Sequence, residues 1–188
     1  MFIRNAGRPL SALVALLFPL FVAVFAAPAA TAAPANVAPL AVTVTYDTSR
    51  AEEFAADWDA GAEIWNASVS TVRLVKASPG SSADITILAD DGWPRAQVFS
   101  LGSGIVWMGR TAVDDGYYVV RITAHELGHI LGLPDRRTGL CADLMSGSSA
   151  PVSCQNARPN AAEAAEVAQN FAGRERAAIP AAVFVDQP

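Results

Sequence analysis

The two histidines of this chain, His125 and His129, lie four residues apart, and Glu126 directly follows the first. In an α-helix, four residues make slightly more than one turn, so both imidazoles project from the same face. Two imidazoles placed in this way can bind one zinc ion. The neighbouring Glu126 then points to the side of the ion, where a carboxylate can act as general base on a metal-bound water.

The third ligand has to be something other than histidine. A catalytic zinc ion usually has three protein ligands and one open position. Gly132 can adopt a positive φ and turn the chain sharply after the helix. Asp135 follows this turn and can return beneath the helix. The predicted zinc ligands are therefore His125, His129 and Asp135.

The same residues also have an ordinary structural interpretation. Two histidines and a glutamate can lie on a core helix without binding a metal, and Asp135 can be a turn residue after a proline. Gly128 indicates a special environment, because a glycine inside a helix costs about 1 kcal/mol relative to alanine. A close neighbour at that position would explain it, and the joint pattern favours the zinc site.

Periodicity predicts the elements that position these residues. Alternating or β-branched runs predict strands at 41–46, 71–76, 84–89, 98–101 and 105–108. Helical spacing predicts three helices. The first begins with a capping box of Ser49 and Glu52 and ends near residue 67, and the second, at 118–131, carries the histidine motif. The third spans 160–173 and is capped by Asn160 and Glu163. Residues 133–156 are expected to be irregular, and 174–188 show no clear periodicity. This order predicts an α+β fold, with a twisted mixed sheet carrying an active-site helix and a C-terminal helix.

Cys141 and Cys154 are the two cysteines of the chain. An exported protein meets oxidising conditions, so one disulfide is the first expectation, and two thiol metal ligands are the alternative. Closing a loop this short stabilises a fold by about 3 kcal/mol in the chain-entropy estimate.

The N-terminal segment predicts export. Arg4 and Arg8 precede an apolar run and a small-residue exit, so residues 1–32 are interpreted as a signal peptide, with a retained membrane anchor as the alternative. Residues 33–40 are then a short linker or vestigial pro-segment, 41–173 the domain that carries the predicted zinc site and 174–188 a C-terminal tail. Removing the signal leaves 11 basic and 18 acidic residues, a formal charge of −7.

This acidic balance excludes nucleic acid as a partner, because phosphate binding needs a basic face. It suits a secreted, extracellular protein. We expect a monomer with no stable membrane association after signal removal.

Several stretches together carry a resemblance to a known family. "HELGHILGLPD" has the form H-E-x-x-H-x-x-G-x-x-D, and "VTVTYD", "IWNASV", "LCADLMSG" and "SCQNARPNAAE" accompany it. The set resembles snapalysin, a family of small secreted metzincin-like zinc metalloproteases of streptomycetes, over about residues 41–172.

The resemblance implies a mostly parallel sheet with one antiparallel edge strand and an active-site helix below it. It also implies that Met145 is the Met-turn residue beneath the zinc ligands and that Cys141 and Cys154 are bridged. Family members are endopeptidases that prefer an aromatic residue just after the cut bond.

Two positions depart from the family pattern. Arg137 stands where the family has a tyrosine that can stabilise the oxyanion, and its guanidinium is a candidate for the same role. Tyr118 stands where the family has an aspartate that binds calcium, so a structural calcium ion is not expected.

The predicted function is a secreted zinc-dependent metalloendopeptidase, with residues 41–173 as the zinc metalloprotease domain, protein or peptide substrates, and Glu126 as general base. The alternative is a secreted zinc-binding protein of the same fold with little or no proteolytic activity.

Overall fold

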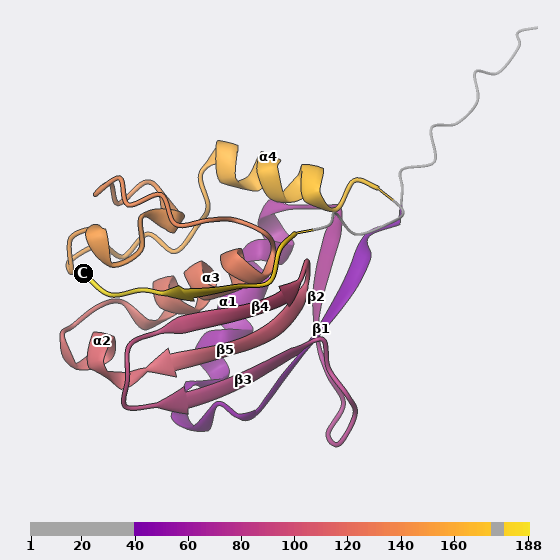
Figure 1. The fold of residues 1–188 in the computed structure, drawn as a ribbon, viewed down its shortest axis with the longest axis horizontal. Helices are drawn as coiled ribbons and strands as arrows, with labels where there is room; N and C mark the ends of the chain where they lie inside the picture. Colours follow the sequence, from indigo (N-terminus) through magenta and orange to yellow (C-terminus); the bar gives the residue numbers. More distant parts are fainter. Residues whose placement is uncertain (1–39, 174–178) are drawn as a thin grey trace, which may run out of the picture. The chain divides into compact units, whose positions relative to one another are not determined.

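A mixed sheet is the frame of the described residues (Figure 1). Its strands are β1 (Val42–Arg50), β2 (Val72–Lys76), β3 (Ile85–Asp90), β4 (Arg95–Ser100), β5 (Ser103–Gly109) and β6 (Ala182–Val185). They lie in the order β2-β1-β3-β5-β4-β6. The neighbours from β2 to β5 are parallel, whereas β4 is antiparallel to both β5 and β6.

The computed structural model describes residues 40–173 and 179–188. The predicted signal peptide 1–32 and most of the predicted linker 33–40 lie outside this part of the chain. Within the described part, no helix combines the length and the apolar character needed to cross a bilayer.

One face of the sheet is buried beneath two helices. Alternate residues of each central strand point inward, as expected for a sheet with one covered face; they include Val44, Ile85, Ile87, Val98, Val106 and Met108. The helices α1 (Ala55–Ser68) and α3 (Val119–Ile130) cover this face and pack against each other. Trp65 of α1 is fully buried, and its Nε1 donates a hydrogen bond to the Ala124 carbonyl of α3 at 2.8 Å. The motif helix is therefore part of the core.

The third long helix, α4 (Ala161–Asn170), begins as the sequence predicts. Asn160 accepts a hydrogen bond from the Glu163 backbone, and Glu163 accepts one from the Asn160 backbone, so the capping box is confirmed. The helix ends three residues before the predicted stop at Gly173. Two 3-10 helices, Glu52–Phe54 and Leu144–Ser149, and the short helix α2 (Arg110–Asp114) were not predicted.

The predicted capping box at Ser49 and Glu52 is wrong. Strand β1 continues to Arg50, and the Ser49 hydroxyl bonds to Asp47 inside that strand at 2.9 Å. The Glu52 carboxylate instead binds Arg110 at 2.5 Å. Because the side chains that would form the cap have other partners, the chain enters α1 through the 3-10 turn.

The C-terminal residues differ most from expectation. Residues 182–185 form β6, although no regular element was predicted in 174–188. The strand pairs with the outer side of β4, so the antiparallel strand is not at the edge of the sheet as the resemblance implied. An isolated run of four residues carries little signal of its own, and an available strand edge decides whether it pairs.

The irregular segment between α3 and α4 is held by two kinds of link. Cys141 and Cys154 are disulfide-bonded, which confirms the expected pairing. The buried Arg121 donates hydrogen bonds to the carbonyls of Cys141, Asp143 and Asn156. A guanidinium with several acceptors can order a stretch of chain that lacks backbone ladders of its own.

Candidate active site

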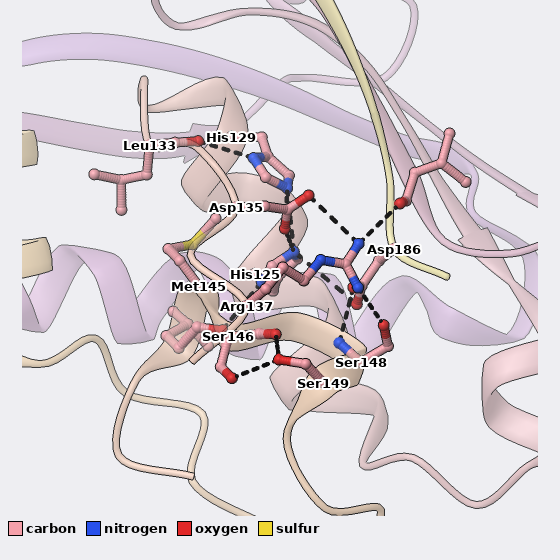
Figure 2. Close-up of polar contacts among 12 residues, drawn as sticks. His125, His129, Leu133, Asp135, Arg137, Met145, Ser146, Ser148, Ser149 and Asp186 are labelled. Atoms are coloured by element: carbon pink, nitrogen blue, oxygen red, sulfur yellow. Dashed lines mark hydrogen bonds and ion pairs between the residues drawn. The ribbon is translucent and has the colours of Figure 1, made fainter. Parts of the chain in front are cut away.

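His125 and His129 point toward each other from one face of α3 (Figure 2). Their Nε2 atoms lie 3.1 Å apart, and both rings are about 1% exposed. His125 Nδ1 faces the Leu144 carbonyl at 3.0 Å, and His129 Nδ1 faces the Leu133 carbonyl at 2.8 Å. A carbonyl only accepts, so each Nδ1 carries hydrogen and each Nε2 is the atom left to bind something else.

Asp135 returns to these two rings through the turn at Gly132. Gly132 has a φ of 95°, and the chain bends there as the sequence predicts. Asp135 Oδ1 lies 3.3 Å from His125 Nε2 and 3.6 Å from His129 Nε2. One nitrogen from each ring and one carboxylate oxygen thus surround a common point, and these three side chains could hold a metal ion.

Glu126 lies beside this cluster and is fully buried. Neither of its carboxylate oxygens has a hydrogen-bond partner among the described residues, and the same is true of Asp135 Oδ1. Burial raises the pKa of Glu126 well above its ordinary value. Buried acceptors without partners are costly, so they indicate a site built to receive a cation or a reacting group.

The two histidines have opposite proton affinities. Burial lowers the pKa of His125, but the Asp135 carboxylate, whose Oδ1 lies 3.3 Å from His125 Nε2, and the charges of Asp186 and Glu126 outweigh burial and raise the pKa to about 9. Burial and the positive charge on His125 lower the pKa of His129 to about 3. In the protein alone, His125 therefore carries a second ring proton, on Nε2, at neutral pH, whereas His129 stays neutral. A divalent cation fits the same position, because it can accept both Nε2 lone pairs and the Asp135 oxygen together.

Met145 packs beneath the histidine helix in a turn that a buried carboxylate fixes. It is fully buried, and its Sδ lies 2.6 Å from where a Cβ on Gly128 would be. This contact explains why α3 carries a glycine at that position. Glu163 accepts hydrogen bonds from the backbone N–H groups of Met145 at 2.8 Å and Leu144 at 3.1 Å.

Comparison with known proteins shows which family this chain belongs to. Residues 41–173 match the model of the Streptomyces extracellular neutral proteinase (M7) family. The chain belongs to this family. It is 43% identical over 141 residues to the extracellular small neutral protease of Streptomyces coelicolor, and these cover 73% of this chain and 63% of that protein. The protein of the same name from Streptomyces sp. (strain C5) is 41% identical over 143 residues, which cover 76% and 62%.

A third relative is covered more fully. The extracellular small neutral protease of Streptomyces caespitosus is 41% identical over 128 residues, which cover 67% of this chain and 94% of that protein. By contrast, the chain spans less than two thirds of the length of the first two relatives. The resemblance inferred from the H-E-x-x-H-x-x-G-x-x-D motif and its accompanying stretches is confirmed.

Arg137, the residue that departs from the family pattern, does lie beside the site. Its φ is 50°, a conformation that non-glycine residues rarely adopt. Its Nη2 lies 3.5 Å from Asp135 Oδ2 and donates to the Val185 carbonyl at 3.2 Å. Its Nη1 donates to Ser148 Oγ at 2.7 Å and to the Gln187 carbonyl at 2.5 Å. In this family member the guanidinium thus binds the C-terminal residues.

Sequence reasoning missed two residues at this site. Asp186 is 6% exposed, and its Oδ2 lies 4.0 Å from His125 Nε2. Tyr117 donates its hydroxyl to the Ser148 carbonyl at 3.0 Å and lines the same pocket as Asp186 and His125. The short apolar run Val183–Val185 was the available, weak signal for the strand that delivers Asp186.

Proposed function

We propose that this chain is an extracellular zinc-dependent metalloendopeptidase, in line with the names of its relatives. The main support is that His125 Nε2, His129 Nε2 and Asp135 Oδ1 lie close together. Beside them is the buried carboxylate of Glu126, which has no hydrogen-bond partner among the described residues. The zinc ion would be held by the two histidines and Asp135. When bound, it would supply Lewis-acid polarisation of the scissile carbonyl.

The protein's own residues would carry the proton transfers. Glu126 would take a proton from the attacking water, because its desolvated carboxylate is more basic than an exposed one. It would then pass that proton to the leaving amine. The backbone carbonyls of Leu144 and Leu133 would keep the two imidazoles in the orientation that aims Nε2 at the ion.

Arg137 remains the candidate donor to the oxyanion. Its guanidinium lies beside Asp135 and would reach the site once its contacts with the C-terminal residues are released. Met145 would act as the Met-turn residue by packing under α3. A second candidate function, zinc binding with little or no proteolysis, is favoured by one observation: the donors of Arg137 are held by the C-terminal residues.

The test is the Glu126→Gln variant of the full chain. We expect the variant to bind zinc in the same amount as the parent protein, because Glu126 is not among the proposed ligands. Casein hydrolysis should fall by about 10³-fold, the middle of the range of about 10²–10⁴ for loss of a general base. A chelator should abolish the activity of the parent protein, and added zinc should restore it.

Glu166→Gln is the matched control, because Glu166 is a more exposed carboxylate that pairs with Arg136 on the surface. It should hydrolyse casein like the parent protein. Hydrolysis by Glu126→Gln at the parent rate would refute the assigned role of Glu126. A parent protein that binds zinc and cleaves no peptide would favour the second candidate function.

A further inference from the structure

The C-terminal strand lies along β4, in front of α3 (Figure 1). Arg95 pairs with Val185 and Val98 pairs with Ala182, so β6 occupies the outer edge of β4 along residues 95–98. The pairing continues beyond β6, where the Asp186 N–H donates to the Pro94 carbonyl at 3.0 Å. A strand edge beside a reactive centre is a general way to bind an extended peptide, because it offers unpaired backbone groups.

Two side chains of this segment reach the metal-binding residues. The Phe184 ring stacks on the His129 ring, with centroids 4.1 Å apart and planes 5° from parallel. Asp186 Oδ1 accepts a hydrogen bond from the Ser148 N–H at 2.8 Å, which turns Oδ2 toward His125 Nε2. One ligand atom each from Asp186, His125 and Glu126 lie within 4.8 Å of one another.

The rest of the site is shaped to receive this carboxylate. A Cβ on Gly147 would lie 2.3 Å from Asp186 Oδ1, so only a glycine allows the approach. Arg137 faces Asp186 Oδ1 at 3.4 Å and also binds the carbonyls on either side of Asp186. A buried carboxylate needs a paired charge to offset its lost hydration, and Arg137 supplies it.

We propose that residues 179–188 form a built-in inhibitory segment, in which β6 occupies the peptide-binding edge of β4 and Asp186 provides an additional ligand to the zinc ion. This inference rests on the proposed function. The segment lies beyond residues 41–173, the stretch that the family model matches. A fourth protein ligand fills the position that a catalytic zinc ion keeps open, and β6 blocks the strand that would align a substrate.

The segment is held in a way that allows release. Val183 is 64% exposed and Val185 is 40% exposed, so β6 buries only one side against the protein. Displacement of the segment, by cleavage or by a competing peptide, would therefore open the zinc site without disturbing α3. Full activity would then require that the segment leave β4.

The experiment compares three full-length, zinc-loaded proteins: the parent, Asp186→Asn, and the double variant Phe184→Ser with Asp186→Asn. The rate of zinc transfer to an excess of a coloured chelator is measured first, and casein hydrolysis second. If the segment covers the site nine-tenths of the time, both rates should rise roughly tenfold in the double variant. Backbone amides of β4 should exchange hydrogen faster, while the urea midpoint of the protein changes little.

Val183→Ala is the matched control, because this side chain lies on the same strand and points to solvent. It should leave both rates unchanged. Asp186→Asn is nearly isosteric and should speed zinc transfer even if the double variant fails to fold.

Two results separate the inhibitory segment from the proposed function. Zinc transfer, hydrolysis and β4 exchange at parent rates in both variants would overturn the inhibitory segment and leave the peptidase intact. Faster zinc transfer and faster β4 exchange, with no hydrolysis by any of the proteins, would support Asp186 as a ligand and overturn the peptidase.

Discussion

The site is built from two regions that are held in different ways. The first region, α3 with the turn Leu144–Ser149, carries both histidines of the proposed zinc site and is named the metal-binding floor. It is buried, and its histidine rings and the backbone of its turn have hydrogen-bond partners from several parts of the chain. The covering strand, β6 with Asp186, has one exposed side and is held through the β4 ladder and through Arg137. Both regions place a carboxylate near His125, yet only the first is part of the core.

This difference in burial and bonding indicates which region can move while the rest of the fold stays intact. Glu163 is 1% exposed and accepts hydrogen bonds from the backbone N–H group of Met145, inside the loop closed by the disulfide, and from that of Asn160, beyond it. Removing the Glu163 carboxylate would leave buried N–H donors without acceptors, so a rearrangement of the metal-binding floor costs much free energy. The covering strand can exchange its backbone hydrogen bonds for those of water or of another peptide. A rigid floor and a releasable cover are the two properties that the proposed inhibitory segment requires.

The largest effect is expected from Glu163→Ala, which breaks the metal-binding floor. The N–H groups of Leu144, Met145 and Asn160 would lose their acceptor. At about 1–3 kcal/mol for each buried donor, the free energy of unfolding should fall by about 4 kcal/mol, as measured by urea denaturation. Glu166→Ala on the same helix should change it by less than about 1 kcal/mol, because its pair with Arg136 is partly exposed.

Equal effects of these two substitutions would contradict the comparison. They would mean that the turn under α3 does not depend on the buried carboxylate. A large loss for Glu163→Ala alone would locate the stability of the site in the metal-binding floor.

The metal-binding floor could be predicted from the sequence because its geometry is local. The four-residue spacing of His125 and His129, together with the turn at Gly132, fixes three ligand directions within one helix and one bend. The unfavourable glycine at position 128 correctly indicated a close neighbour, which is Met145. The capping box of Asn160 and Glu163 was predictable for the same reason.

The covering strand could not be predicted in this way. Its pairing with β4 depends on contacts between residues distant in sequence, and four residues are too few to show a period. The residues around Asp186 in the sequence therefore give no sign that it lies near His125. The false capping box at Ser49 has the reverse cause: the local pattern was present, but the continuation of β1 outweighed it.

A smaller effect is expected from Gly128→Ala, which tests the packing inside the metal-binding floor. The new methyl group would lie 2.6 Å from Met145 Sδ and 3.3 Å from Trp65 Cζ2. Overpacking typically costs about 1–3 kcal/mol and should outweigh the gain of about 1 kcal/mol in helix propensity. Thermal and urea unfolding should both show net destabilisation.

Met145→Ala provides the second arm of this test. In the double variant the sulfur is absent, so the cost of the methyl group at position 128 should largely disappear. A double-mutant cycle should give a coupling energy of about 1 kcal/mol or more. Strict additivity would show that some other neighbour requires the glycine.

The smallest effect is expected from a charge pair outside the metal-binding floor, at the start of β4. Asp90 is 38% exposed at its side chain and binds Arg95, whose Nη2 lies 2.5 Å away. The hydrogen bond from Arg95 lowers the pKa of Asp90 below its ordinary value of 3.8. Because the folded-state pKa is depressed, the pair stabilises the fold above pH 3.8 and loses this effect as the pH falls through the folded-state pKa.

Asp90→Asn should therefore lower the free energy of unfolding by at most about 1 kcal/mol at neutral pH, and by less in acid. Urea unfolding of both proteins at neutral and acidic pH measures this difference. A loss at neutral pH as large as that of Glu163→Ala, or one that persists in strong acid, would remove the contrast between surface charges and those that hold the metal-binding floor.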